Sequence, residues 1–250
     1  MIEGLVSIIT PMHNSARTVA QTIESVQKQT YQNWEMIIVD DGSIDDGAEL
    51  VQRYAHDDSR IRLYKNDKNV GVASTRNIAV KKANGQYLAF LDSDDLWRSD
   101  KLEKQLQLME NTGCSFCYGM CGVIDNEGKN INKDRIVPRS IDFEQLLKGN
   151  DIPCLTVLLD RKVIKEVEMP NMPHEDYACW LTIFRKYDIV AYGVQAVVAD
   201  YRIGEKSVSS NKFKVIGWTW NIYRNYLGLS FWKSAGCFAW YAIKAVVKRI

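Results

Sequence analysis

Strands and helices alternate through the first hundred residues of the chain. Four apolar runs have the length and flanks of buried strands: residues 6–10, 34–39, 61–64 and 86–91. Two segments between them, residues 18–29 and 48–55, carry apolar residues at helical spacing, and a further helix is expected over residues 73–83. This order predicts an α/β fold with a parallel central sheet and helices on both of its faces.

The pattern becomes mixed after Glu110. Strands are expected at 115–124, 155–159 and 189–201, and helices at 141–147 and 177–187. No linker, repeat or low-complexity segment interrupts the chain before about residue 205. We therefore predict one domain over residues 1–210, with a mainly parallel central sheet, and a helical tail over residues 211–250.

The fourth strand candidate runs directly into three carboxylates, Asp92, Asp94 and Asp95. Carboxylates at the end of a buried strand lie at the edge where open α/β sheets bind ligands. Asp92 and Asp94 can both turn toward one cation, and hard oxygen ligands suit Mg²⁺ or Mn²⁺ held jointly with a substrate's phosphates. The alternative is that Asp95 or Ser99 caps a helix over residues 100–110.

Polar clusters also follow the first two strand candidates: His13-Asn14 and Asp40-Asp41. Because the carboxyl ends of parallel strands share one edge of a sheet, we expect these clusters to converge with the three carboxylates. Asp40 can accept a hydrogen bond from the imide of a uracil or from ribose hydroxyls. The segment from Asp41 to Ser43 is also favourable for an Asx-turn, which is the structural alternative.

Two further motifs carry a functional and a structural interpretation each. Gly71 precedes a helix, where a small residue lets a phosphate or sugar approach the backbone, and Arg76 adds a fixed charge. The alternative is a loop glycine and an arginine on a solvated helix face.

Glu175 and Asp176 precede Trp180 at the start of a helix. They either complement the helix dipole or supply a general base for an acceptor hydroxyl.

Six cysteines are present, but no second Cys or His pair stands at the spacing that closes a tetrahedral zinc site. Cys117 and Cys121 alternate within a strand candidate, so we interpret them as packing residues. The N-terminus lacks the basic segment and apolar core of a signal peptide. Both observations fit a reducing cytoplasm.

The charges are distributed unevenly. Eight Lys and Arg residues and no Asp or Glu follow Glu205, which leaves 24 of the 32 basic and all 31 acidic residues before that point. Residues 212–250 hold four of the seven tryptophans, and charges interrupt every apolar run that could span a bilayer. We predict that this tail lies on an anionic membrane surface; the alternative is a pair of helices packed on the domain. The acidic remainder argues against nucleic acid as a partner.

Five of these segments, in order, resemble the motifs of the family 2 glycosyltransferases. The segments are VSIITPMHN at 6–14, VDDGS at 39–43, NVG at 69–71 followed by Arg76-Asn77, FLDSDD at 90–95, and Glu175-Asp176 followed by Trp180. They cover roughly residues 5–205. The resemblance implies a single Rossmann-like nucleotide-sugar-binding domain of the kind called GT-A.

The resemblance also implies roles for individual residues. The nucleotide base, usually uracil, would be held by Pro11, His13 and Asp40. The rest of the nucleotide and sugar pocket would be lined by Asp41, Gly71, Arg76 and Ser93. Asp92 would reach the ribose and the metal, Asp94 would be the main protein ligand of Mn²⁺ or Mg²⁺, and Asp176 would be the base. Residues 201–209 resemble a loop that closes over the donor.

The expected activity is metal-dependent, inverting transfer of a sugar from a UDP-sugar to a saccharide hydroxyl. A lipid-linked acceptor would suit a protein held on the cytoplasmic face of the membrane, as in bacterial cell-surface polysaccharide assembly. One alternative is a nucleotidyltransferase, although that class normally shows a glycine-rich basic loop after the first strand. The other is a non-catalytic module that binds a sugar nucleotide or a membrane.

Overall fold

The computed structural model describes residues 1–203 and 212–247, with only the backbone described for 212–216 and 242–247. The described strands are β1 (Ile2–Met12), β2 (Trp34–Asp40), β3 (Ile61–Lys65), β4 (Gly85–Phe90), β5 (Leu96–Trp97), β6 (Phe116–Ile124), β7 (Ser140–Ile141), β8 (Leu158–Asp160) and β9 (Ala191–Arg202). The helices are α1 (Val19–Gln27), α2 (Gly47–Asp57), α3 (Val72–Lys82), α4 (Lys101–Thr112), α5 (Phe143–Leu146), α6 (Glu175–Tyr187), α7 (Lys212–Asn221) and α8 (Phe231–Val247).

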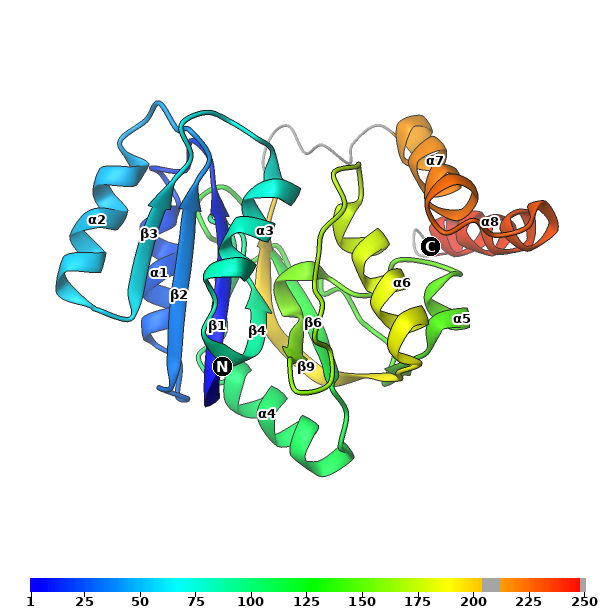
Figure 1. The fold of residues 1–250 in the computed structure, drawn as a ribbon, viewed down its shortest axis with the longest axis horizontal. Coiled ribbons are helices and arrows are strands. Elements are labelled where there is room, and N and C mark those ends of the chain that lie inside the picture. Colours follow the sequence, from blue (N-terminus) through cyan, green and yellow to red (C-terminus); the bar gives the residue numbers. More distant parts are fainter. Residues whose placement is uncertain (204–211, 248–250) are drawn as a thin grey trace.

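All nine described strands belong to one sheet, in the order β3-β2-β1-β4-β8-β6-β9-β5, with β7 paired to β9 (Figure 1). Strands β3, β2, β1 and β4 are mutually parallel, as the alternation predicts. Strand β8 is antiparallel to both β4 and β6, whereas β6 and β9 run parallel to each other. The sheet is therefore mainly parallel, which confirms the predicted fold class.

Successive residues of a strand point to opposite faces of the sheet, so both faces of this sheet carry apolar side chains. Helices cover both faces. Ile9 and Ile37 belong to the hydrophobic core that α3 and α6 cover, and Ile8 and Ile38 belong to the core under α1, α2 and α4. Strands β1, β2 and β4 are thus buried on both sides, whereas the edge strand β3 is only partly buried. This explains why the strand candidates read as continuous apolar runs.

One predicted strand is wrong in part. The residues expected as a strand at 155–159 begin with a 3₁₀ turn over Cys154–Thr156, and β8 starts only at Leu158. The turn forms because Thr156 donates to the Pro153 carbonyl oxygen through both its amide, at 3.0 Å, and its hydroxyl, at 2.8 Å. This turn brings Cys154 toward the carboxyl edge of the sheet, where it lines a pocket.

The C-terminal tail packs on the domain over part of its length. Ile222 and Tyr223, in a π-helical turn between α7 and α8, are fully buried in the core beside α6. The Tyr223 hydroxyl donates to the Leu147 carbonyl and lies 3.0 Å from the Tyr177 hydroxyl. The packing alternative is therefore observed for this segment. The predicted boundary at residue 210 and most of the predicted donor loop lie outside the described residues.

We expect the Tyr223→Phe substitution to lower the free energy of unfolding by about 1–2 kcal/mol, because it leaves the buried Leu147 carbonyl without its partner. Tyr226→Phe is the matched control, since Tyr226 is 38% exposed and its hydroxyl only accepts a bond from Thr182. Urea denaturation measures both. Equal effects of the two substitutions would show that the tail is not anchored through Tyr223.

Candidate active site

The polar clusters that follow β1, β2 and β4 lie at one edge of the sheet. Met12 pairs with Asp40 in the parallel register of β1 and β2, and Ile9 pairs with Phe90 in that of β1 and β4. The residues that follow each strand therefore leave the sheet at the same edge. The Ser15 and Ser93 hydroxyls, 2.8 Å apart, join the first cluster to the third.

Asp41 holds the loop that leads into α3. Its carboxylate accepts hydrogen bonds from the backbone amides of Val70 and Gly71, both at 2.9 Å, and from the Asn66 amide at 2.8 Å. Burial opposes ionisation, but these donors outweigh it and lower the pKa of Asp41. Gly71 has a φ of 88°, a conformation that side chains rarely adopt, and it forms the N-cap of α3. Asp41 thereby fixes where α3 begins.

His13 and Asp40 lie beside this loop. The His13 ring donates from Nδ1 to the Asp41 carbonyl oxygen at 3.0 Å, so its Nε2 accepts from the amides of Asn14 and Asn69. The Asp40 carboxylate accepts from the amide and hydroxyl of Ser43, three residues later. The Asx-turn that the sequence offers as an alternative at Asp41 is not formed, because the Asp41 carboxylate binds the amides of Val70 and Gly71 instead. Pro11 is buried in β1. These residues adjoin one another but do not line the pocket described next.

A pocket of about 700 Å³ opens beside the end of β4. Its lining includes all of the predicted catalytic and metal-binding residues, Asp92, Asp94 and Asp176, together with Arg76 and Glu175. Two residues without a predicted role in the site also line it: Asp95 and Arg202. Asp176 is half-buried and, among the described residues, makes no hydrogen bond or ion pair. Its carboxylate is therefore available to a ligand. The fold brings these residues from four separate segments to one cavity.

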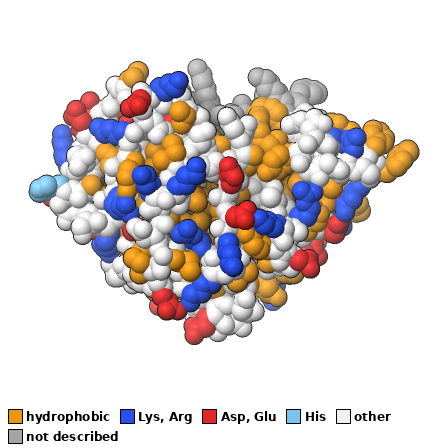
Figure 2. Space-filling view, viewed as in Figure 1, with side chains coloured by type: hydrophobic (Ala, Val, Ile, Leu, Met, Phe, Trp, Pro, Cys, Tyr) orange, Lys and Arg blue, Asp and Glu red, His pale blue; other side chains and the backbone are white. Residues whose placement is uncertain are grey.

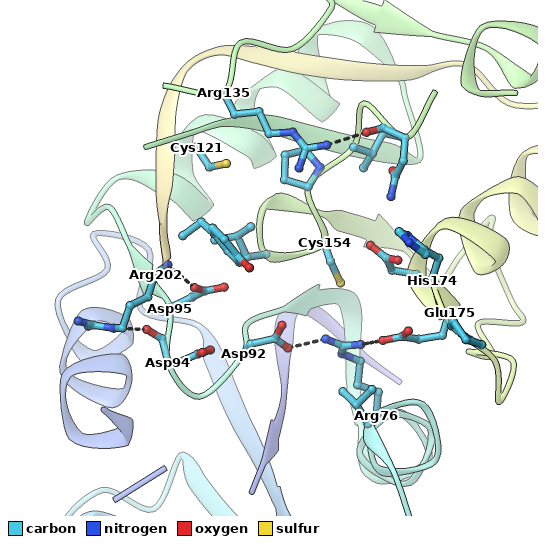
Figure 3. Close-up of a pocket in the computed structure, with 18 of the residues that line it drawn as sticks. Arg76, Asp92, Asp94, Asp95, Cys121, Arg135, Cys154, His174, Glu175 and Arg202 are labelled. Carbon is cyan, nitrogen blue, oxygen red and sulfur yellow. Dashed lines mark hydrogen bonds and ion pairs between the residues drawn. The ribbon is translucent and has the colours of Figure 1, made fainter. Parts of the chain in front are cut away.

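Arg76 bridges two carboxylates from distant segments (Figure 3). Its Nη2 lies 2.6 Å from Asp92 Oδ1, and its Nη1 pairs with Glu175 Oε1. The side chain is only 5% exposed, so the solvated-face alternative is wrong. Burial disfavours the charge, but the two carboxylates outweigh it and raise the pKa of Arg76. The planar fork of a guanidinium suits this bridge, because it donates to two partners at once.

Asp95 does not cap a helix. Helix α4 begins at Lys101 with Asp100 as its N-cap and no side-chain capping bond, so the capping alternative is wrong for Asp95 and Ser99. Asp95 is buried and accepts from the Arg202 amide at 2.8 Å. Burial, followed by the charges of Asp94 and Asp92, raises the pKa of Asp95.

Arg202 is a residue that sequence reasoning missed. Its guanidinium donates to the carbonyl oxygens of Asp94, at 2.7 Å, and of Asp125 and Asn126, and to the Gln21 side chain at 2.7 Å. These hydrogen bonds connect the Asp94 backbone to β9, the strand that ends at Arg202. An arginine at the end of a strand is too common a pattern to indicate such a role.

The carboxylates present suit a hard divalent cation. Desolvation, followed by the charge of Asp92, raises the pKa of Asp94 to about 6. Asp92 and Asp94 provide oxygen donors of the kind that Mg²⁺ and Mn²⁺ prefer. Over residues 1–203 and 212–247, no group of three or more His, Cys, Asp or Glu side chains is arranged to hold a metal.

The sequence of the chain was compared with those of known proteins. Residues 7–188 match the model of the family described as glycosyl transferase family 2. The chain is 41% identical over 247 residues to the putative teichuronic acid biosynthesis glycosyltransferase TuaG of Bacillus subtilis, a match that covers 98% of each chain. It is 40% identical over 222 residues to the Escherichia coli UDP-Glc:alpha-D-GlcNAc-diphosphoundecaprenol beta-1,3-glucosyltransferase WfgD, covering 89% of this chain and 86% of the relative.

Two solved structures share the fold. One is S. aureus TarS 1–349 in complex with UDP-GlcNAc, with a TM-score of 0.73, 17% identity and coverage of 95% of this chain and 71% of that chain. The other is the mannosyltransferase PcManGT from Pyrobaculum calidifontis in complex with GDP-Man and Mn²⁺, with a TM-score of 0.70, 15% identity and coverage of 96% and 75%. These similarities confirm the predicted GT-A fold.

Removing the Arg76 bridge leaves Asp92 and Glu175 without their shared partner. We expect Arg76→Ala to lower the free energy of unfolding by about 3 kcal/mol, because breaking a buried ion pair strands the remaining charges. Lys104→Ala is the control: Lys104 pairs with Asp100 at the surface, and its loss should cost less than about 1 kcal/mol. Chemical denaturation at neutral pH measures both, and similar losses would contradict the bridge.

Proposed function

The chain belongs to glycosyl transferase family 2, and we propose that it transfers a sugar from a UDP-sugar to a hydroxyl of a lipid-linked saccharide, with inversion at the anomeric carbon. The observation that carries the proposal is the pocket at the end of β4. Its lining includes Asp92 and Asp94 together with Asp176, which makes no hydrogen bond or ion pair with the residues that the structure describes. A leaving diphosphate and an attacking hydroxyl need these two environments in one cavity.

The named relatives support the choice of substrates. WfgD and the E. coli glucosyltransferase WfaP, which is 38% identical over 250 residues, are both named for UDP-Glc as donor and for a diphosphoundecaprenol-linked GlcNAc as acceptor. TuaG is named for teichuronic acid biosynthesis. We infer from these names that the present chain uses a UDP-sugar and a lipid-linked acceptor in polysaccharide biosynthesis.

The donor would bind along the carboxyl edge of the sheet. Pro11, His13 and Asp40 would surround the uracil, and the Asp41–Gly71 loop, Arg76 and Ser93 would line the rest of the nucleotide and sugar site. Asp92 and Asp94 would hold Mn²⁺ or Mg²⁺. When bound, the cation would neutralise charge that develops on the leaving diphosphate. The raised pKa of Asp94 supports a cation beside it.

Asp176 would act as the general base. Its carboxylate would accept the proton of the acceptor hydroxyl while that oxygen bonds to the anomeric carbon. The bond from this carbon to the diphosphate oxygen breaks in the same step, and its electron pair leaves with the diphosphate. One displacement inverts the configuration, so an α-linked donor gives a β-linked product. Arg76 would act indirectly, because it connects Asp92 to Glu175, the neighbour of Asp176.

Substitutions of Asp176 and Asp94 should separate chemistry from binding. We expect Asp176→Asn to lower kcat by about 10²–10⁴-fold and to leave the affinity for UDP with Mn²⁺ within threefold, because it removes only the proton acceptor. Asp94→Asn should weaken that affinity at least tenfold. Calorimetric titration with UDP and a UDP-release assay measure the two effects. Undiminished turnover in Asp176→Asn would exclude it as the base.

We further propose that the tail contacts an anionic membrane at its cytoplasmic face. Figure 2 shows hydrophobic and basic side chains together at the end of the molecule formed by α7 and α8. Trp232 is 83% exposed, and Phe231 and Trp240 are each 54% exposed. Within the described residues, no helix has both the length and the apolar character needed to cross a bilayer. An interfacial contact would bring the pocket to a lipid-linked acceptor.

The membrane contact can be tested with vesicles that contain about one-third phosphatidylglycerol. We expect the Trp232→Ala/Trp240→Ala double variant to bind them at least tenfold more weakly than the unmodified protein, because it removes two exposed interfacial rings. Ile44→Ala should bind normally, since Ile44, although 94% exposed, lies between β2 and α2 at the other end of the molecule. Co-sedimentation measures binding, and equal binding by all three proteins would refute the contact.

A further inference from the structure

The pocket at the end of β4 extends beyond the predicted catalytic residues. Its second half is lined by residues of four other segments: Arg135, Asn150 with Ile152 to Leu155, Met172 to His174, and Trp218 of α7. The predicted roles assign nothing to this half. Trp218 is notable because it comes from the C-terminal tail, for which the sequence suggests a membrane surface or packing on the domain but no part in the pocket.

Trp218 forms a fixed wall of the pocket. Its ring centroid lies 5.4 Å from that of His174, with the two planes at 60°, and the indole is half-buried. Ile222, four residues later, is fully buried in the core, and Tyr223 is bonded to the Leu147 carbonyl. Because this anchor follows within about one helical turn, the position of Trp218 is set by the domain itself.

Among the residues that the structure describes, the pocket lining includes three polar atoms without hydrogen-bond partners, two in this half and one on Arg76 beside it. Among the described residues, six buried side-chain nitrogen or oxygen atoms lack a hydrogen bond, and three of them belong to residues that line this pocket: Arg76 Nε, Asn150 Oδ1 and His174 Nε2. Buried polar groups are almost always paired. Three unpaired groups around one cavity, beside an exposed aromatic face, complement a ligand with both hydroxyl groups and an apolar face. A pyranose ring has both.

Arg135 adds a positive charge to this half (Figure 3). Its Nη2 donates to the Asn150 carbonyl oxygen at 2.6 Å. The other two arginines of the pocket are engaged, Arg76 by two carboxylates and Arg202 by carbonyl oxygens and Gln21. Within residues 1–203 and 212–247, Arg135 has no carboxylate partner within ion-pair distance, so its charge is available to an anion.

We propose that this half of the pocket binds the acceptor: Trp218, His174 and Asn150 hold a pyranose ring, and Arg135 holds the diphosphate to which that ring is linked. The inference rests on the proposed transferase function and names its acceptor class. His174 is the N-cap residue of α6 and stands two positions before Asp176. A sugar held by Trp218 and His174 is therefore close to the proposed base, with the donor on the side of Asp92.

Calorimetric titration tests the proposal without knowledge of the donor sugar. The protein is saturated with UDP and Mn²⁺ and titrated with α-GlcNAc diphosphate that carries an undecyl chain. We expect Trp218→Ala to bind this probe at least tenfold more weakly and Trp218→Phe to bind it within threefold of the unmodified protein. Tyr226→Ala is the control, because Tyr226 is an aromatic residue of the same tail that lies outside the pocket. Its affinity should be unchanged.

A second ligand separates the sugar from the diphosphate. Methyl α-N-acetylglucosaminide lacks the diphosphate, so Arg135→Gln should weaken binding of the undecyl probe at least fivefold but leave competition by the methyl glycoside unchanged. Trp218→Ala should weaken both. Unchanged binding of the probe by Trp218→Ala would overturn the proposal, as would a protein that binds UDP with Mn²⁺ but not the probe. Failure to bind UDP would instead refute the proposed function itself.

Discussion

The buried bridge from Asp92 through Arg76 to Glu175 connects the parts of this protein that have to act together. Asp92 follows β4, Arg76 lies on α3 and Glu175 opens α6, so one guanidinium joins three elements. Helix α3 is itself held at its first residue by Asp41, which follows β2. The proposed nucleotide site, the carboxylates proposed to bind a metal and the proposed base therefore share one rigid support. The two carboxylates stabilise the buried positive charge of Arg76. In turn, Arg76 stabilises the negative charges of Asp92 and Glu175.

Much of the fold could be predicted from the sequence, because continuous apolar runs separated by helical segments leave few alternatives to a parallel sheet. The positions of His13, Asp41 and Asp92 at one edge follow from the same rule. The burial of Arg76 could not be predicted. Its partner Glu175 is 99 residues away, and the surface of α3 has no strong apolar face to show which side is covered. Asp95 and Arg202 were missed for the same reason, since they pair across more than 100 residues.

The tail shows how two interpretations of one segment can hold together. Its composition indicates a membrane surface, and its buried residues, Ile222 and Tyr223, show that it is also part of the domain core. The two observations concern different residues of the tail: Ile222 and Tyr223 are buried, whereas Trp232 and Trp240 are exposed. The packed face brings Trp218 to the pocket. A segment that contacts both the membrane and the acceptor site would couple the position of the protein on the bilayer to the substrate that it receives.

The central claim is a single displacement in which one carboxylate activates the acceptor and the donor's diphosphate leaves from the opposite face. The anomeric configuration of the product tests this claim most directly. Incubation of the protein with Mn²⁺, an α-linked UDP-sugar of the gluco configuration and a lipid-linked acceptor, followed by proton NMR of the product, should show the large H1–H2 coupling of a β-linkage. The small coupling of an α-linkage would mean retention, which one displacement at this site cannot produce.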